Sequence, residues 1–319
     1  MKKQMIRFLK KILLLLLVII GITFLSFCLT YLAPSDPAQM LYESQGIVPT
    51  EEMLQTTRER MGLNRPMLVQ YASWLGDFFR GDLGESVKSG KPVFSEMLKV
   101  LPNTLRLTVI AMLISVSISI LVGVLCARYR NGYFDRIVRI ITYAFASLPS
   151  FFLSLILMYL FCVKIQIFPV ISMDSPGGIV LPAVVLGLTN AAWFSRQVRA
   201  ITVRELNSEY VLGLRSRGVP EMRILFRHVL KNSLLPILTL IGVSFGSLLG
   251  GSTIVESIFS WPGLGKQAVE SIGFRDYPMI QGYVVWMALI FLLVNVLVDF
   301  SYQCLDPRVR KQAEVKERQ

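Results

Sequence analysis

The chain has 319 residues, of which 53% are hydrophobic and only 17% charged, and its mean hydropathy is +0.56. Soluble domains have about a quarter of their residues charged, so this composition excludes an ordinary soluble protein. The formal net charge of +12 would suit a nucleic-acid-binding protein, but no basic patch is interleaved with aromatic residues in a soluble domain, and we exclude nucleic acid as a partner. The composition predicts a polytopic membrane protein.

Six apolar runs are long enough to cross a hydrocarbon core about 30 Å thick, which takes roughly 20 helical residues. These runs are residues 12–32, 103–127, 137–163, 179–198, 233–257 and 281–303. The first run is longer than the apolar part of a cleaved signal peptide and no small-residue cleavage motif ends it, so we expect it to remain as a spanning helix. The predicted fold class is an all-α polytopic membrane protein with six transmembrane helices.

The distribution of basic residues predicts the orientation of these helices. If the N-terminus is inside, the inner segments hold 22 of the 33 Lys and Arg residues and 7 of the 21 acidic residues. The inner face then carries a net charge of +15 and the outer face −2, which is the usual positive-inside bias. We expect both termini in the cytoplasm.

The segment 33–102, between the first two runs, is too long for a plain connector. It contains two helix signals: Thr50 as an N-cap with Gly62 as the stop, and Pro66 at a first-turn position with Gly81 as the stop. In the second helix five apolar residues can share one side: Leu68, Tyr71, Leu75, Phe78 and Phe79. We expect either a helical platform on the outer membrane surface or a packing element without a partner of its own.

The sequence offers few groups for catalysis or metal binding. His228 is the only histidine, which excludes every paired-histidine metal site, and the four cysteines have no CxxC spacing. The stretch SWPGLGKQ resembles a Walker A motif, but Ser260 and Gln267 stand where that motif needs glycine and a magnesium-binding hydroxyl. We therefore predict a protein that is not an enzyme and has no cofactor and no metal site, so that any ATP hydrolysis resides in another chain.

Small and polar residues within the apolar runs indicate where helices meet. Gly242, Gly246 and Gly250 repeat every four residues and form one smooth face, suited to close helix packing or to lining a pathway. Asn295 and Asp299 share a face of the last run, and Asp299 lies near its inner end, where it can pair with an inner arginine.

Proline and glycine divide two further segments. Pro149 lies inside the third run and should bend it. In the inner stretch 208–236 a short helix from about Asn207 to Arg217 is followed by Gly218 and by Pro220, which can start a new helix. Positive-inside bias alone explains the cations there, but not this layout of helix, glycine and helix. We expect the segment to dock another protein.

Several motifs resemble those of one known family, the B-type permeases of bacterial ABC importers for oligopeptides, dipeptides and nickel. The resemblance covers nearly the whole chain. The stretches that carry it are Glu209 to Pro236, GGSTIVESIFSWPGLGKQAVESIGFRDYPMIQGY at 250–283, TYLAPSDPA at 30–38, GDLGES at 81–86 and LDPRVR at 305–310.

The resemblance implies the fold of type I importer permeases and gives roles to particular residues. The inner loop would carry a coupling helix that sits in a cleft of the ATPase subunit, with contacts by Glu209, Tyr210, Leu212, Arg215 and Gly218. The general importer motif has Glu-Ala-Ala six residues before its glycine, whereas residues 212–214 here are Leu-Gly-Leu. The outer loop motif comprises Trp261, Pro262, Gly263 and Gly265.

The resemblance also implies partners and a location. We expect a second related permease, two ABC ATPase subunits and an extracytoplasmic substrate-binding protein, in a bacterial cell membrane. The predicted parts of the chain are a cytoplasmic N-terminus with the first helix (1–32), an extracytoplasmic helical segment (33–102), a transmembrane domain (103–303) with its coupling loop (199–232), and a cytoplasmic tail (304–319).

For the substrate, the outer stretch 49–76 and YVLGLRSRGV look closer to the nickel permeases of this family than to most peptide permeases. We therefore expect nickel import, with oligopeptide or dipeptide import as the alternative and an ion-coupled secondary transporter as a distant one. Nickel favours imidazole and thiolate ligands, and the chain has no obvious set of them. Nickel would then pass as a chelate delivered by the binding protein.

Overall fold

The computed structural model describes the chain except for residues 1, 34–35, 45, 173–174, 176 and 306–319, and the described residues form helices and no regular strand. The predicted tail beyond Leu305 lies outside this described part. The helices are α1 (Lys2–Tyr31), α2 (Pro37–Ser44), α3 (Glu51–Arg60), α4 (Met67–Phe79), α5 (Val93–Arg128), α6 (Tyr133–Ser147), α7 (Ser150–Met158), η1 (Tyr159–Lys164), α8 (Val180–Leu206), α9 (Glu209–Ser216), α10 (Glu221–Arg223), η2 (Ile224–Val229), α11 (Leu230–Ile258), α12 (Leu264–Gly273) and α13 (Tyr277–Leu305).

The chain folds as two compact units, and both are discontinuous in sequence. Unit 1 comprises Met1–Asn103 and Pro262–Leu292, and unit 2 comprises Thr104–Trp261 and Leu293–Gln319. The long helices α5 and α13 each contribute to both units. Each unit is described separately below.

In unit 1 both helix signals of the segment 33–102 are confirmed. Thr50 caps α3 by accepting a hydrogen bond from the Met53 amide at 3.4 Å, and α4 begins directly after Pro66. Gly62 and Gly81 end these helices at φ +69° and +85°, in the left-handed region where glycine costs little.

Helix α4 packs against α1 through aromatic residues, of which Tyr71 is the most buried. Its ring lies edge-on to Phe24 and Phe27, with centroids 5.2 and 5.6 Å away, and its hydroxyl donates to the Ile20 carbonyl at 3.0 Å. Leu68 remains 66% exposed, so the apolar side predicted for this helix is only partly covered within the chain.

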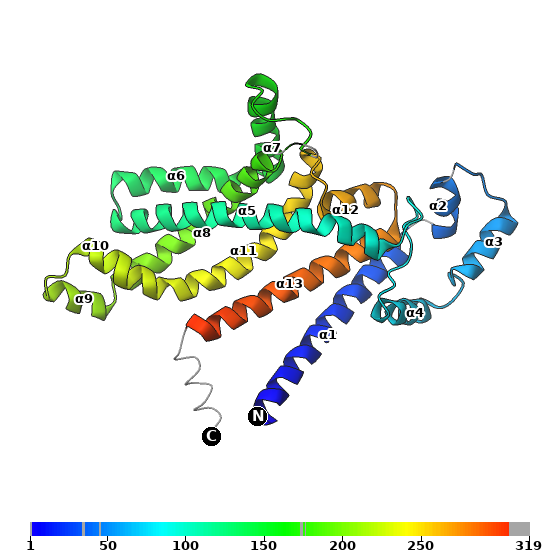
Figure 1. The fold of residues 1–319 in the computed structure, drawn as a ribbon, viewed down its shortest axis with the longest axis horizontal. Coiled ribbons are helices and arrows are strands. Elements are labelled where there is room, and N and C mark those ends of the chain that lie inside the picture. The colour runs from blue at the N-terminus through cyan, green and yellow to red at the C-terminus, as the bar shows by residue number, and fades with distance from the viewer. Residues whose placement is uncertain (1, 34–35, 45, 173–174, 176, 306–319) are drawn as a thin grey trace. The chain divides into compact units, whose positions relative to one another are not determined.

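In unit 2 the run 137–163 is broken rather than continuous. Helix α6 ends at Ser147 and α7 begins at Ser150, and the two axes differ by 98°. The residue before a proline is disfavoured in the helical region, and Leu148 is extended at ψ 125°. The predicted bend at Pro149 is confirmed, and Figure 1 shows α7 turning away from the direction of α6.

Three helical spans among the described residues are long and apolar enough to cross a membrane: Val93–Arg128, Glu221–Ile258 and Tyr277–Val298. The bent pair of α6 with α7 and η1 would make a fourth, and the apolar part of α1 that the structure describes, Leu16–Tyr31, is shorter. Helix α8 has the length but carries polar residues along it, which matters for the site below.

Unit 2 is held together by close packing of α5, α8 and α11. A Cβ added to Gly123 would lie 2.8 Å from the Ser195 carbonyl oxygen, and one added to Gly187 would lie 2.7 Å from Ile114 Cγ2. These contacts let the backbones of α5 and α8 approach closely. Fully buried side chains such as Phe194 fill the space between the helices.

Candidate functional site

The inner stretch 208–236 has the predicted helix, glycine, helix layout. Helix α9 is followed by Gly218 at φ +73°, a conformation that side-chain-bearing residues rarely adopt. The chain then enters α10 after Pro220. A π-helical turn, η2, joins α10 to α11, and this turn was not predicted.

Helix α9 has one anchored side and one open side. Val211 is fully buried, while Leu212 is 65% exposed and Glu209 is also exposed. The Tyr210 hydroxyl donates to Glu205 Oε2 at 3.2 Å, which ties the helix to the end of α8. The open side therefore presents the predicted coupling residues on a helix that is fixed at its base.

Arg215 makes an intramolecular contact that sequence reasoning missed. Its guanidinium donates two hydrogen bonds to the Glu221 carboxylate, from Nε to Oε1 at 2.6 Å and from Nη2 to Oε2 at 3.2 Å. These bonds raise the pKa of the Arg215 guanidinium, which stays charged. The pair spans the Gly218 turn at a spacing of six residues, which no helix-pairing rule covers.

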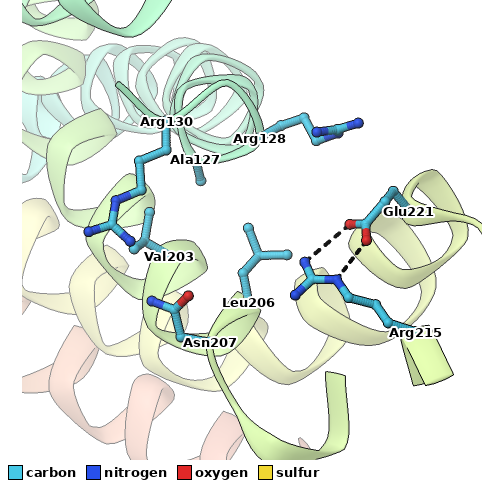
Figure 2. A pocket seen from close by; sticks show the side chains of 8 residues that line it. All are labelled: Ala127, Arg128, Arg130, Val203, Leu206, Asn207, Arg215 and Glu221. Atoms are coloured by element: carbon cyan, nitrogen blue, oxygen red, sulfur yellow. Dashed lines mark hydrogen bonds and ion pairs between the residues drawn. The ribbon is translucent and has the colours of Figure 1, made fainter. Parts of the chain in front are cut away.

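A pocket of about 150 Å³ lies between this pair and the ends of α5 and α8. Arg128 lines it from the end of α5 and Arg130 from the turn after α5, while Leu206 ends α8 and Asn207 follows it (Figure 2). The pair of Arg215 and Glu221 closes another side of it. The turn after α9 therefore borders this pocket.

A second ion pair joins α6 to α8. The fully buried carboxylate of Asp135 accepts two hydrogen bonds from Arg199, at 2.7 and 2.8 Å, and a third from the Asn131 amide at 3.0 Å. No motif pointed to this pair, because its members lie 64 residues apart in the sequence. Breaking a buried pair of this kind costs about 3–5 kcal/mol.

Unit 2 also contains a groove of about 320 Å³ with apolar and uncharged polar lining residues, which we call the α7–α8–α11 groove. Its lining includes no ionisable side chain and no thiol. The polar or aromatic side chains in it are Ser150, Thr189, Asn190, Trp193, Ser244 and Ser247. None of these residues was singled out from the sequence, because single hydroxyl and amide groups in a helix form no recognisable motif.

The predicted glycine face is divided between two environments. A Cβ added to Gly242 would lie 2.8 Å from Val298 Cγ2, so α13 of the same chain already covers that position. Gly246 is half-buried and Gly250 is exposed, with no atom near its would-be Cβ. Asn295 is exposed on α13, and the side chain of Asp299 lies outside the described part of the structure.

The residues of the SWPGLG motif lie at the end of α11 and the start of α12. The Trp261 amide donates to the Glu256 carbonyl at 2.8 Å and closes the end of α11, while Gly263 precedes the first residue of α12. The Pro262 carbonyl accepts a hydrogen bond from Asn103 Nδ2 at 2.8 Å. Gly265 is buried in the first turn of α12.

Two further motifs, GDLGES and RDYP, meet in unit 1 at one carboxylate. Asp276 is 1% exposed and accepts hydrogen bonds from Ser86 Oγ at 2.5 Å and from the Lys88 amide at 3.2 Å. Its other oxygen accepts from the Met279 amide at 3.3 Å and so caps the start of α13. The two motifs therefore serve one structural junction.

No metal-binding group is evident among the residues that the structure describes. They contain no cluster of three or more His, Cys, Asp or Glu side chains that could hold an ion. His228 is half-buried in η2.

Comparison with known proteins identifies the family. Residues 119–311 match the model of the binding-protein-dependent transport system inner membrane component, and residues 5–108 match the model of its N-terminal part. The chain is 36% identical to the glutathione transport system permease protein GsiC of Pectobacterium atrosepticum, over 95% of this chain and 98% of that one. It is 32% identical to the dipeptide transport system permease protein DppB of Alkalihalophilus pseudofirmus (94% and 98%) and 34% identical to the metal-staphylopine import system permease protein CntB of Staphylococcus aureus (96% and 98%).

Solved structures show the same fold. An inward-facing MetNI methionine ABC transporter chain matches 66% of this chain and 96% of its own length, with a TM-score of 0.58 at 20% identity. The chain belongs to the family of binding-protein-dependent transport system inner membrane components, and it is a multi-pass, non-catalytic permease subunit of an ABC importer whose ATPase activity resides in partner subunits.

Proposed function

We propose that this permease forms half of a translocation pathway for short peptides or for peptide-like metal chelates, delivered by an extracytoplasmic binding protein. The observation that carries the proposal is the similarity, over at least 94% of the chain, to permeases named for a dipeptide, for glutathione and for metal-staphylopine. The first two names denote short peptides, and the third denotes a metal bound to a small molecule.

Nickel import, which the sequence predicts, fits this proposal only as import of a chelate. The relation to CntB favours a chelated metal, and the relations to DppB and GsiC favour a peptide equally. A bare nickel ion would need imidazole or thiolate ligands, and the described residues hold no cluster of them.

The remaining parts of the proposal concern topology and coupling. The chain would cross the membrane six times with both termini inside, and the segment 33–102 would lie outside near the binding protein. The second permease would be related to this one, and one of two ATPase subunits would bind the open side of α9 through Glu209, Tyr210 and Leu212. Arg215 and Gly218 would hold that helix in position.

Reconstitution tests the substrate assignment. The complex of this chain with its second permease, two ATPase subunits and binding protein would be placed in liposomes. Uptake would be compared for the dipeptide dialanine, for a nickel–histidine chelate and for nickel chloride. We expect ATP-dependent uptake of dialanine or of the chelate and none of the free ion; uptake of nickel chloride alone, or of none of the three, would contradict the proposal.

A further inference from the structure

The α7–α8–α11 groove is lined by residues near the middle of two long helices. Asn190 stands about 15 Å from the start of α8, a helix of 27 residues and so about 40 Å long. Ser244 lies near the middle of α11, which has 29 residues. Both residues are thus well inside a hydrocarbon core about 30 Å thick, if α8 and α11 cross it.

The polar atoms of the groove are not fully used within the described chain. Ser244 is 1% exposed, and its hydroxyl has no hydrogen-bond partner among the described residues. Asn190 donates from Nδ2 to Ser115 Oγ at 2.8 Å, and its amide also lines the groove. Thr189, by contrast, is satisfied by the Val185 and Leu186 carbonyls of its own helix.

Polar groups at this depth are costly against lipid. Unsatisfied donors and acceptors in hydrocarbon cost several kcal/mol each, so they are tolerated only inside protein or beside a water-filled cavity. A groove that holds the Ser244 hydroxyl, which has no hydrogen-bond partner among the described residues, therefore suits water or a polar occupant.

The chemistry of the lining defines the occupant. Without charged or thiol groups, the groove has no means of holding a bare ion. Its hydroxyl and amide groups can pair with the N–H and C=O of a peptide bond, and Trp193 offers an aromatic surface to an apolar side chain.

We infer that the α7–α8–α11 groove is a contact surface for the transported solute, and that it binds an uncharged amide group of that solute through Asn190 and Ser244. This inference rests on the proposed function and adds to it the residues and the chemical group that are recognised. The groove thus favours peptides over chelates that lack an amide.

Cysteine labelling tests whether the groove is aqueous. In a complex without native cysteines in this chain, Ser247→Cys should react with a small charged thiol reagent, because Ser247 is an exposed lining residue. Leu113→Cys, at an apolar position of α5 that is 62% exposed, serves as the comparison and should react at least tenfold more slowly. If both positions are equally unreactive, lipid or a helix of the second permease covers the groove, and the inference is wrong.

Uptake kinetics test the amide contact. Asn190→Leu and Ser244→Ala should each raise the KM for dialanine about two- to tenfold, since each loses one hydrogen bond, while ATPase turnover stays unchanged. Asn190→Gln, which keeps the amide, should recover part of the loss.

A matched control separates binding from packing. Ser252→Ala removes a buried hydroxyl of α11 that lies outside the groove lining and bonds the Leu249 carbonyl. It should keep the wild-type KM. Equal KM values for Asn190→Leu and wild type would overturn the inference and leave the permease function intact.

N-methylated dialanine distinguishes an amide contact from a general polar one. Its methyl group replaces the peptide N–H hydrogen, so the concentration needed to inhibit dialanine uptake should be about two- to tenfold higher in wild type than in Asn190→Leu. Any preference of the binding protein is the same in both complexes and cancels in this comparison. A wild-type complex that imports no dialanine would count against both the peptide function and the amide contact, whereas Ser247 labelling would still decide whether the groove is aqueous.

Discussion

At the scale of single residues, the ion pair between Arg215 and Glu221 changes the role that the sequence suggests for Arg215. The family resemblance implies a contact with the ATPase, but in the structure both guanidinium hydrogen bonds go to a carboxylate of the same chain. The pair joins the two sides of the Gly218 turn and is drawn in Figure 2. We therefore propose that Arg215 affects coupling by fixing the direction of α9.

A charge swap tests this role of Arg215. Arg215→Glu should lower the solute imported per ATP hydrolysed by about fivefold, which corresponds to roughly 1 kcal/mol, because two carboxylates would then face each other across the turn. The double variant R215E/E221R restores an ion pair of opposite direction and should recover most of the coupling. Failure of the double variant to recover, in reconstituted liposomes, would mean that Arg215 contacts the ATPase directly.

Residue contacts of this kind were beyond sequence reasoning for a physical reason. The capping role of Thr50 and the left-handed turn at Gly218 depend on neighbouring residues, and both were predicted correctly. The contacts of Asp135 with Arg199 and of Ser86 with Asp276 join residues 64 and 190 positions apart, and nothing local in the sequence marks them.

At the scale of elements, the break between α6 and α7 places Ser150 at the edge of the α7–α8–α11 groove. The sequence located the bend correctly, because proline restricts the residue before it regardless of context. It did not indicate that the two parts diverge by 98°, since that angle depends on how α7 packs against α8 and α11.

Replacement of Pro149 by alanine tests the cause of the break. Without the proline, Leu148 is free to become helical, and α6 and α7 should approach one continuous helix. Spin labels at Ile140 and Leu155, both exposed, would then lie about 22 Å apart along the helix axis, farther than in the bent wild type. An unchanged distance distribution would show that tertiary packing alone maintains the bend.

At the scale of the whole molecule, the glycines of α11 indicate which surface remains for the second permease. Gly242 is covered by Val298 of the same chain, whereas Gly250 has no atom near it. We therefore expect the partner permease to approach near Gly250 and not near Gly242.

Leucine substitutions separate these two environments. Gly242→Leu should destabilise the isolated chain in detergent by about 1–3 kcal/mol, because the new side chain clashes with Val298. Gly250→Leu should leave that stability unchanged and reduce copurification of the second permease. Normal assembly of the Gly250→Leu variant would place that face against lipid.

The predicted topology is tested by labelling intact cells. Ser73 on α4 and Ser216 on α9 are both exposed, and they should lie on opposite sides of the membrane. A membrane-impermeant thiol reagent should label Ser73→Cys and should label Ser216→Cys only after the membrane is opened. Labelling of Ser216→Cys but not Ser73→Cys in intact cells would mean that the chain has the opposite orientation in the membrane. Labelling of both in intact cells would contradict the prediction that an odd number of membrane crossings separates the two residues.

The junction at Asp276 has a consequence for how the protein is made. Ser86 leaves the ribosome early, but its carboxylate partner follows 190 residues later, which at about 5–20 residues per second is a delay of roughly 10–40 s. Throughout that interval the early part of unit 1 is without the later segment that completes it, and its polar groups are available to chaperones and proteases. A chain truncated before Asp276 should therefore be degraded rapidly in the cell, even though most of its membrane helices are already present.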